Sequence, residues 1–175
     1  MSVFLLQMAA IAGVDKRVWA RSHIPPGARR NWLEKYTGII GNVVWLLALG
    51  YSVFLPLQFA SIWFYLGLFA FVIGVILLVT ATVNFVTAPP DELVTTGAYR
   101  YSRHPMYLAS LLICLGSGLA ALSWLFILLS TAMAICFHRE ALIEERYCLD
   151  KYGNAYQQYR SRTPRWVGLP RRNHR

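Results

Sequence analysis

The richest group of side chains that can bind or react lies in the run GAYRYSRHPMY, residues 97–107. Arg103 and His104 directly precede Pro105, and proline is favoured at the first position of a helix, where its missing N–H has no cost. A helix start offers N–H groups to an anion or to ring acceptors. His104 and Tyr107 are three residues apart, so they share a helix face and can hold a small polar ligand. The alternative is an ordinary belt of interfacial tyrosines beside a snorkelling arginine.

A second group of ionisable side chains occupies HREALIEER, residues 138–146. Glu140 and Glu144 are one helical turn apart and share a face, while Arg139 directly precedes Glu140. Ionisable groups at the inner edge of a membrane bundle are functional candidates. The catalytic candidates are therefore Arg139, Glu140 and Glu144, and the alternative is a solvated helix surface with alternating charges.

Three tyrosines at positions 152, 156 and 159 recur at helical spacing in YGNAYQQY, and Thr163-Pro164-Arg165 follows them. This spacing predicts a helix face that packs the tail against the end of a bundle, even where such packing also closes a site.

Two long runs without a charged side chain, residues 36–90 and 104–138, surround the first group and must position it. Each is long enough for two short spans, since one span needs about 20 residues. Pro56 and Gly116-Ser117-Gly118 are the predicted turns. The expected fold is an all-α integral membrane protein with four transmembrane helices near residues 37–55, 60–86, 105–117 and 121–138, the last two forming a helical hairpin.

The chain is expected to form a single membrane domain, residues 1–175. Residues 1–35 hold a short apolar helix, which is either a fifth span or a helix lying in the interface, and a basic cytoplasmic segment. Residues 36–86 form a helix pair, and 87–175 hold the connector, the hairpin and a helical tail. Gly153 should interrupt the tail helix.

The composition, 57% hydrophobic and 14% charged over 175 residues, excludes an ordinary soluble protein. The formal charge of +9 comes from basic residues beside apolar runs, which indicates anionic lipid headgroups and no nucleic acid. The three charged segments, residues 15–35, 87–103 and 139–175, all fall on one side of the predicted spans. The positive-inside rule therefore places the C-terminus in the cytoplasm. The three cysteines show no metal-ligand spacing, so no metal site is expected.

The order GAYRYSRHPMY, helical hairpin, EE, YG, two further tyrosines and TPR, over about residues 84–170, resembles the membrane methyltransferases that include isoprenylcysteine carboxyl methyltransferase and the phospholipid methyltransferases. The resemblance implies that S-adenosylmethionine binds on the cytoplasmic side, where a methyl group passes to a lipid-borne or hydrophobic acceptor and S-adenosylhomocysteine is released. No obligatory protein partner is implied. The implied cofactor-binding residues are Glu92, Leu93, Val94, Tyr99, His104, Pro105, Met106, Tyr107, Glu144 and Glu145.

The sequence departs from the family pattern on the acceptor side. In such enzymes an arginine one turn before the glutamate faces the acceptor, but here Glu140 precedes Glu144 by four residues, and Arg139 is one position early. A carboxylate acceptor needs only a cation, whereas an amine must lose a proton to a base. O-methylation of an isoprenylcysteine-type carboxylate and N-methylation of a phospholipid amine therefore both stay open.

Two other classes of protein also fit the sequence. A membrane reductase of the sterol reductase kind, which binds NADPH, is similar in its C-terminal helices. A non-catalytic membrane protein can also retain a fold without its activity.

Overall fold

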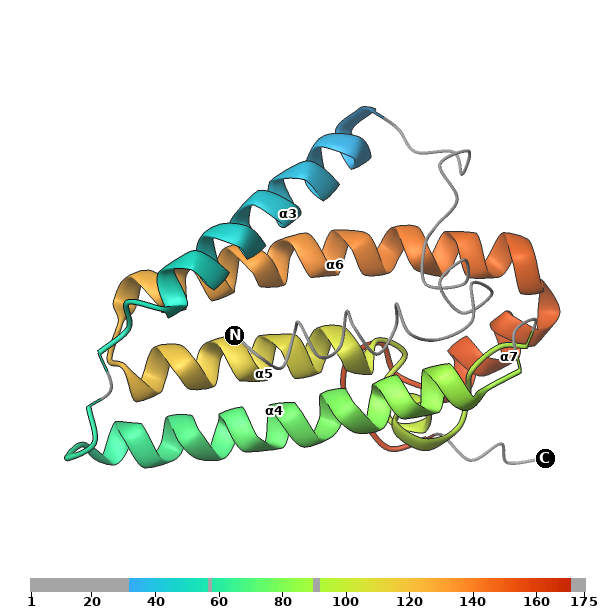
Figure 1. Ribbon diagram of the computed structural model, residues 1–175. Coiled ribbons are helices and arrows are strands. Elements are labelled where there is room, and N and C mark those ends of the chain that lie inside the picture. The colour runs from blue at the N-terminus through green and yellow to red at the C-terminus, as the bar shows by residue number, and fades with distance from the viewer. Residues whose placement is uncertain (1–31, 57, 90–91, 171–175) are drawn as a thin grey trace. The chain divides into compact units, whose positions relative to one another are not determined.

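The computed structural model describes residues 32–56, 58–89 and 92–170, and this part of the chain is helical without any strand (Figure 1). Its elements are α3 (Trp32–Ser52), α4 (Ile62–Thr87), the short 3-10 helix Gly97–Arg100, α5 (Pro105–Ala120), α6 (Trp124–Tyr152) and α7 (Asn154–Arg162). The all-α prediction is therefore confirmed for these residues. The short apolar helix predicted in residues 1–14 and most of the basic segment lie outside the described residues.

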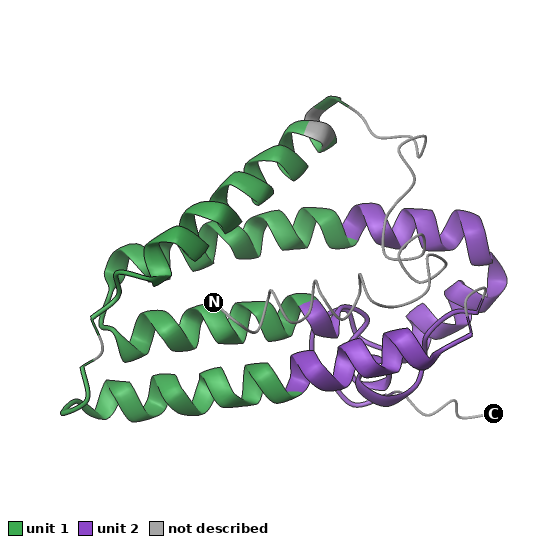
Figure 2. Cartoon of the chain, in the orientation of Figure 1, with its two compact units in different colours: residues 1, 30–76, 107–141 green, residues 2–29, 77–106, 142–175 purple. Residues whose placement is uncertain are grey.

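The chain divides into two compact units (Figure 2). Among the described residues, the first unit holds the chain up to Ile76 and Tyr107–Ala141, and the second holds Leu77–Met106 and the chain from Leu142 onward. The division falls inside α4, α5 and α6, so each of these helices contributes one part to each unit.

Close contact between small residues holds the first unit together. A Cβ atom on Gly116 of α5 would lie 2.6 Å from the carbonyl oxygen of Gly67 and from the amide nitrogen of Phe71, both on α4. Such small residues let two helix backbones approach, as is typical of helices within membranes. A buried apolar cluster joins α3, α5 and α6 and consists of Ala48, Cys114, Phe126 and Met133.

Large apolar side chains cover the outside of the first unit. On α3 and α4 the exposed ones include Ile39, Ile40, Val43, Leu46, Leu47, Leu66, Phe69, Val72 and Ile73. Contiguous exposed apolar surface of this kind is unfavourable in water and favourable in lipid. This surface agrees with a membrane protein.

Two of the helices, α4 and α6, are long and apolar enough to cross a membrane. The apolar part of α3, Tyr36–Ser52, and α5 are shorter than such a span. Among the described residues, the predicted count of four spans is therefore not supported. The prediction divided each uncharged run into two spans on the basis of its length alone.

The predicted turn at Gly116-Ser117-Gly118 is wrong. α5 continues to Ala120, and the chain turns near Leu122, whose φ is 49°. Glycine suggests a turn in a sequence, but Gly116 instead makes room for the backbone of α4. Other predicted ends also differ. α3 begins at Trp32 instead of residue 37, and its first turn includes Glu34, whose charge favours a helix start. α6 continues past residue 138 to Tyr152.

In the second unit, the connector between α4 and α5 is fixed to α4 by a side chain. Asn84 accepts a hydrogen bond from the amide of Ala98 at 2.9 Å. Gly97 has a φ of 60°, and a Cβ atom there would collide with the side chain of Asn84. The predicted break at Gly153 is confirmed, since α6 ends at Tyr152 and Gly153 has a φ of 52°.

Candidate functional site

His104 lies at the start of α5, where local hydrogen bonds fix its backbone. Pro105 is the first residue of the helix, as its fixed φ favours. The amide of His104 donates to Oγ of Ser102 at 3.1 Å, and that hydroxyl donates to the carbonyl of Arg165 at 3.2 Å. The residue is buried, with only 8% of its surface exposed.

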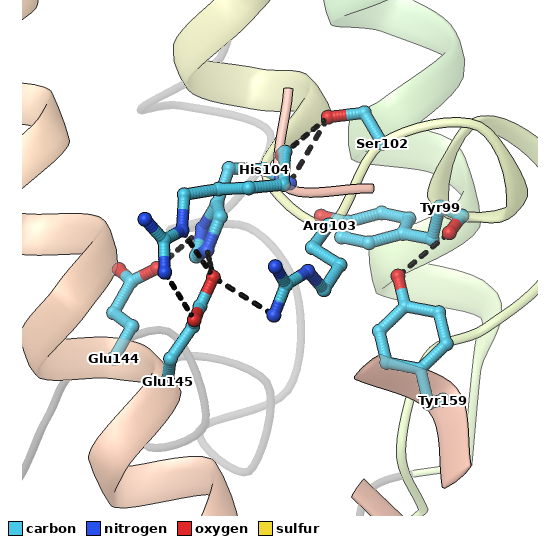
Figure 3. A network of polar contacts seen from close by, with 8 residues as sticks. Tyr99, Ser102, Arg103, His104, Glu144, Glu145 and Tyr159 are labelled. Carbon is cyan, nitrogen blue, oxygen red and sulfur yellow. Dashed lines mark hydrogen bonds and ion pairs between the residues drawn. The ribbon is translucent and has the colours of Figure 1, made fainter. Parts of the chain in front are cut away.

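The two neighbouring glutamates of α6 meet the two nitrogens of this one imidazole (Figure 3). Nδ1 of His104 lies 3.2 Å from Oε2 of Glu144, and Nε2 lies 3.3 Å from Oε1 of Glu145. Burial lowers the pKa of His104, but the hydrogen bonds and charges of the two carboxylates outweigh it and raise the pKa above its ordinary value of 6.5. A protonated imidazole can donate to both carboxylates at once.

Glu145 is the centre of the network. Its carboxylate accepts two hydrogen bonds from Arg165, 2.8 Å from Nε to Oε1 and 2.9 Å from Nη2 to Oε2. Nη1 of Arg103 lies 3.1 Å from the same Oε1. A bidentate arginine and carboxylate pair of this kind is among the strongest contacts between side chains.

The two glutamates differ in their access to solvent. The side chain of Glu145 is 5% exposed, whereas that of Glu144 is 34% exposed. Because both oxygens of Glu145 already accept from arginine, Glu144 is the carboxylate that a ligand from outside can reach. The pair thus combines one structural carboxylate with one accessible carboxylate.

Arg103 offers a donor that the second unit leaves unused. Its side chain is 9% exposed, and Nε is buried with no hydrogen-bond partner among the described residues. A buried donor without a partner costs about 1–3 kcal/mol.

The tyrosines of α7 connect the tail to the turn before α5. The hydroxyl of Tyr159 donates to the carbonyl of Tyr99 at 2.6 Å, and the ring of Tyr156 meets that of Tyr159 edge to face. Burial raises the pKa of the Tyr159 hydroxyl, which therefore stays protonated and able to donate. Tyr156 and Tyr159 are buried, while Tyr152 is only partly covered.

The structure brings some of the predicted site residues together in the second unit. His104, Glu144 and Glu145 are in contact there, and Tyr99 joins them through its carbonyl. The second unit also contains Glu92, Leu93, Val94, Pro105 and Met106.

The remaining predicted site residues, Tyr107, Arg139 and Glu140, belong to the first unit. There the ring of Tyr107 stacks on Phe137 at 4.7 Å between centroids. Among the described residues, no group of three or more His, Cys, Asp or Glu side chains could hold a metal ion.

Sequence reasoning missed Arg165, Trp166, Ser102 and the pairing role of Arg103 as parts of this site. Arg165 and Glu145 are 20 residues apart, and the rings of Trp166 and His104 lie 6.2 Å apart between centroids. One signal was present. Two adjacent glutamates that are to be buried require cations, and Thr163-Pro164-Arg165 supplies one after the last helix.

Comparison with known proteins gives three findings. The profile of the family described as phospholipid methyltransferase matches residues 45–155. Delta(14)-sterol reductase TM7SF2 of Mus musculus is 37% identical over 83 residues, which are 45% of this chain and 19% of that protein. Protein-S-isoprenylcysteine O-methyltransferase of Schizosaccharomyces pombe is 33% identical over 78 residues, 44% of this chain and 33% of that protein. The chain thus spans a third or less of the length of these two relatives.

Proposed function

Because the chain belongs to the phospholipid methyltransferase family, whose profile covers residues 45–155, we propose that it transfers a methyl group from S-adenosylmethionine to a lipid-borne or hydrophobic acceptor at the cytoplasmic face of a membrane. The observation that carries the proposal is this match, since it includes both His104 and the Glu144-Glu145 pair. The similarity to an isoprenylcysteine methyltransferase supports it further.

The side chains of the second unit fit the chemistry of this donor. S-adenosylmethionine carries an ammonium, which needs hydrogen-bond acceptors, a sulfonium, whose positive charge favours negative or electron-rich groups nearby, and a carboxylate, which needs donors. Glu144, 34% exposed, is an accessible acceptor, and the buried Nε of Arg103 is a donor without a hydrogen-bond partner in the described part of the chain. We propose that Glu144, His104 and the backbone of Glu92, Leu93 and Val94 hold the cofactor.

The remaining roles come from the resemblance. Tyr99, Pro105, Met106 and Tyr107 would line the cofactor site. Arg139 and Glu140, which belong to the first unit, would orient the acceptor. Arg139 would supply the cation for a carboxylate acceptor, and Glu140 would supply the base for an amine acceptor.

Bound S-adenosylmethionine supplies an already activated methyl group, so the protein needs mainly to orient the reactants and exclude water. His104 and Arg103 are nine-tenths buried, which supports such a dry environment beside Glu144. If the acceptor is an amine, Glu140, Glu144 or His138 would take its proton before transfer.

A second function is favoured by one observation, the 37% identity to a Delta(14)-sterol reductase over 45% of this chain. In that case the polar side chains of the second unit would bind NADPH. The reductase similarity covers only 19% of that protein, so it carries less weight than a family profile that spans 111 residues, from 45 to 155.

The test uses the full chain in lipid nanodiscs with labelled S-adenosylmethionine and total lipid extract. We expect saturable binding of S-adenosylmethionine, no binding of NADPH, and label in one lipid class. Glu144→Gln should weaken binding at least about tenfold, the loss of one charge-assisted contact. Asp150→Asn, an exposed carboxylate change on the same helix, is the matched control.

The outcomes separate the alternatives. Binding of NADPH with no binding of S-adenosylmethionine would favour the reductase. If His104→Ala and Glu144→Gln both leave the affinity for S-adenosylmethionine unchanged, the proposed site is wrong. If the protein binds neither cofactor, a non-catalytic role remains.

The orientation is a separate proposal from charge. We propose that the C-terminus is cytoplasmic, since the polar segment from Arg139 onward is rich in basic residues beside an apolar run, which the positive-inside rule places in the cytoplasm. A reporter fused after Arg175 should be active in the cytoplasm, and activity on the other side of the membrane would reverse the topology.

A further inference from the structure

The segment after α7, residues 163–168, runs beside the turn that precedes α5. We name it the C-terminal strap. The amide of Arg103 donates to the carbonyl of Pro164 at 3.1 Å, and the amide of Gly168 donates to the carbonyl of Tyr101 at 3.2 Å. Between them, Ser102 donates to the carbonyl of Arg165. Three hydrogen bonds thus join the strap to residues 101–103.

The side chain of Arg165 fastens the strap a second time, to α6. Its Nε and Nη2 lie 2.8 and 2.9 Å from the two oxygens of Glu145, whose side chain is 5% exposed. The side chain of Arg165 is itself 24% exposed, and its loss would remove a bidentate, charge-assisted contact from the buried carboxylate. Arg103 and His104 contact the same carboxylate, so the loss of Arg165 would leave Glu145 with weaker partners.

The strap also carries an aromatic ring to the imidazole. Trp166 directly follows Arg165, and its ring lies 6.2 Å from that of His104 between centroids, with the two planes tilted by 51°. The position of this indole depends on where the strap is held. His104 is therefore ordered from one side by α6 and from another by the strap.

We propose that Arg165 and Glu145 are positioning residues, whose bidentate ion pair holds the C-terminal strap against residues 101–104 and so fixes His104 and Trp166 as part of the cofactor site. Glu145 then contacts no ligand, in contrast to the cofactor-binding role predicted for it from the sequence. The hydrogen bonds and the ion pair that hold the strap do not depend on any assumption about activity. The effect on cofactor affinity rests on the proposed function.

The first experiment measures how tightly the strap is held, with no cofactor present. Trypsin cleaves after arginine and lysine, so Arg165→Lys keeps both the positive charge and the cleavage site but loses the fork of donors. We expect cleavage between residues 165 and 166 to be about tenfold faster in Arg165→Lys and in Glu145→Gln, the effect of one strong hydrogen bond. Asp150→Asn should cleave at the wild-type rate. Equal rates in all four proteins would overturn the proposal.

The second experiment separates positioning from stability. Binding of S-adenosylhomocysteine, the product of the proposed reaction, is measured by calorimetry together with the thermal midpoint. We expect Arg165→Lys to weaken binding about tenfold while the protein remains folded, and Arg165→Gln to weaken it more, so that the lysine variant is a partial rescue. A lower thermal midpoint with unchanged affinity would show a merely structural pair and overturn the positioning role.

Failure of the proposed function has a different signature. If the wild-type protein binds no S-adenosylhomocysteine, the methyltransferase proposal and the positioning role both fail, while the cleavage rates still decide whether the ion pair holds the strap. If Glu145→Gln does not fold, Arg165→Lys decides the cleavage comparison and the two Arg165 variants decide the binding comparison, since both leave α6 unchanged.

Discussion

The two units are stabilised by opposite kinds of contact. In the first, neutral groups pack closely, as where α5 meets α4 at Gly116 and Gly67. In the second, directed polar contacts converge on a few atoms, as where Arg103, His104 and Arg165 share the carboxylate of Glu145. Close packing is sensitive to one added carbon, whereas a polar network is sensitive to one lost donor or proton. The first unit should therefore respond most to added volume, and the second to a lost donor or proton.

The largest effect expected from this difference is that of a bulky residue at the α4 and α5 contact. In Gly116→Leu the new Cβ would lie 2.6 Å from backbone atoms of Gly67 and Phe71, which cannot rotate away. Overpacking against rigid backbone should destabilise the first unit by at least about 3 kcal/mol. Thermal unfolding followed by size-exclusion chromatography in detergent should show little folded protein.

Gly50→Leu on α3 is the matched control for the substitution at Gly116. It makes the same chemical change where a Cβ would meet nothing within 4 Å. We expect its thermal midpoint to stay near that of the wild type or to rise, because glycine is a poor helix former. Equal damage from both substitutions would contradict the view that close packing holds the first unit.

A smaller effect is expected from one hydroxyl of the second unit. Tyr159→Phe removes the donor that contacts the carbonyl of Tyr99 at 2.6 Å and changes nothing else in the ring. This hydrogen bond to the carbonyl is then lost, so the free energy of unfolding should fall by about 1 kcal/mol. Chemical denaturation measures it, with Tyr101→Phe as the control, since Tyr101 is 52% exposed. An equal fall in the free energy of unfolding in both variants would show that the effect does not come from the hydrogen bond to Tyr99.

The sequence predicted the parts of the fold that depend on neighbouring residues. Pro105 starts α5 and Gly153 ends α6, because proline and glycine act locally on the backbone. The approach of His104 to Glu144 was implied only by the family resemblance. Neither the spacing nor the composition of this one chain predicts a contact across 40 residues of sequence.

Two features could not be predicted because they depend on contacts between distant segments. Gly116 resembled a turn residue, and only the backbone of α4 beside it shows why a side chain is excluded. Arg165 resembled a basic residue of a polar tail until the fold placed it on Glu145. In both cases the local sequence pattern was ambiguous, and tertiary contact decided between the possibilities.

The smallest expected effect is that of a single proton on His104. In the described part of the chain, the groups that face this imidazole include Glu144 and Glu145 from α6 and Trp166 from the strap, with Arg103 and Arg165 acting through Glu145. Burial opposes the two carboxylates, but the pKa of His104 is raised above 6.5 in the folded protein. Folding therefore favours the protonated imidazole, and its stabilising contribution is complete below the pKa of the unfolded chain, about 6.5.

As the pH rises through the raised pKa of the folded state, this contribution is lost. The thermal midpoint of the wild type should thus fall between about pH 6.5 and the folded-state pKa, where His104 loses its proton. In His104→Asn this component of the pH dependence should vanish, whereas His138→Asn, which changes an exposed histidine of the first unit, should retain it. If the His104 and His138 variants show the same pH profile as the wild type, the two carboxylates do not hold a proton on His104. The arginine contacts of Glu145 would then remain as the charged contacts of this network.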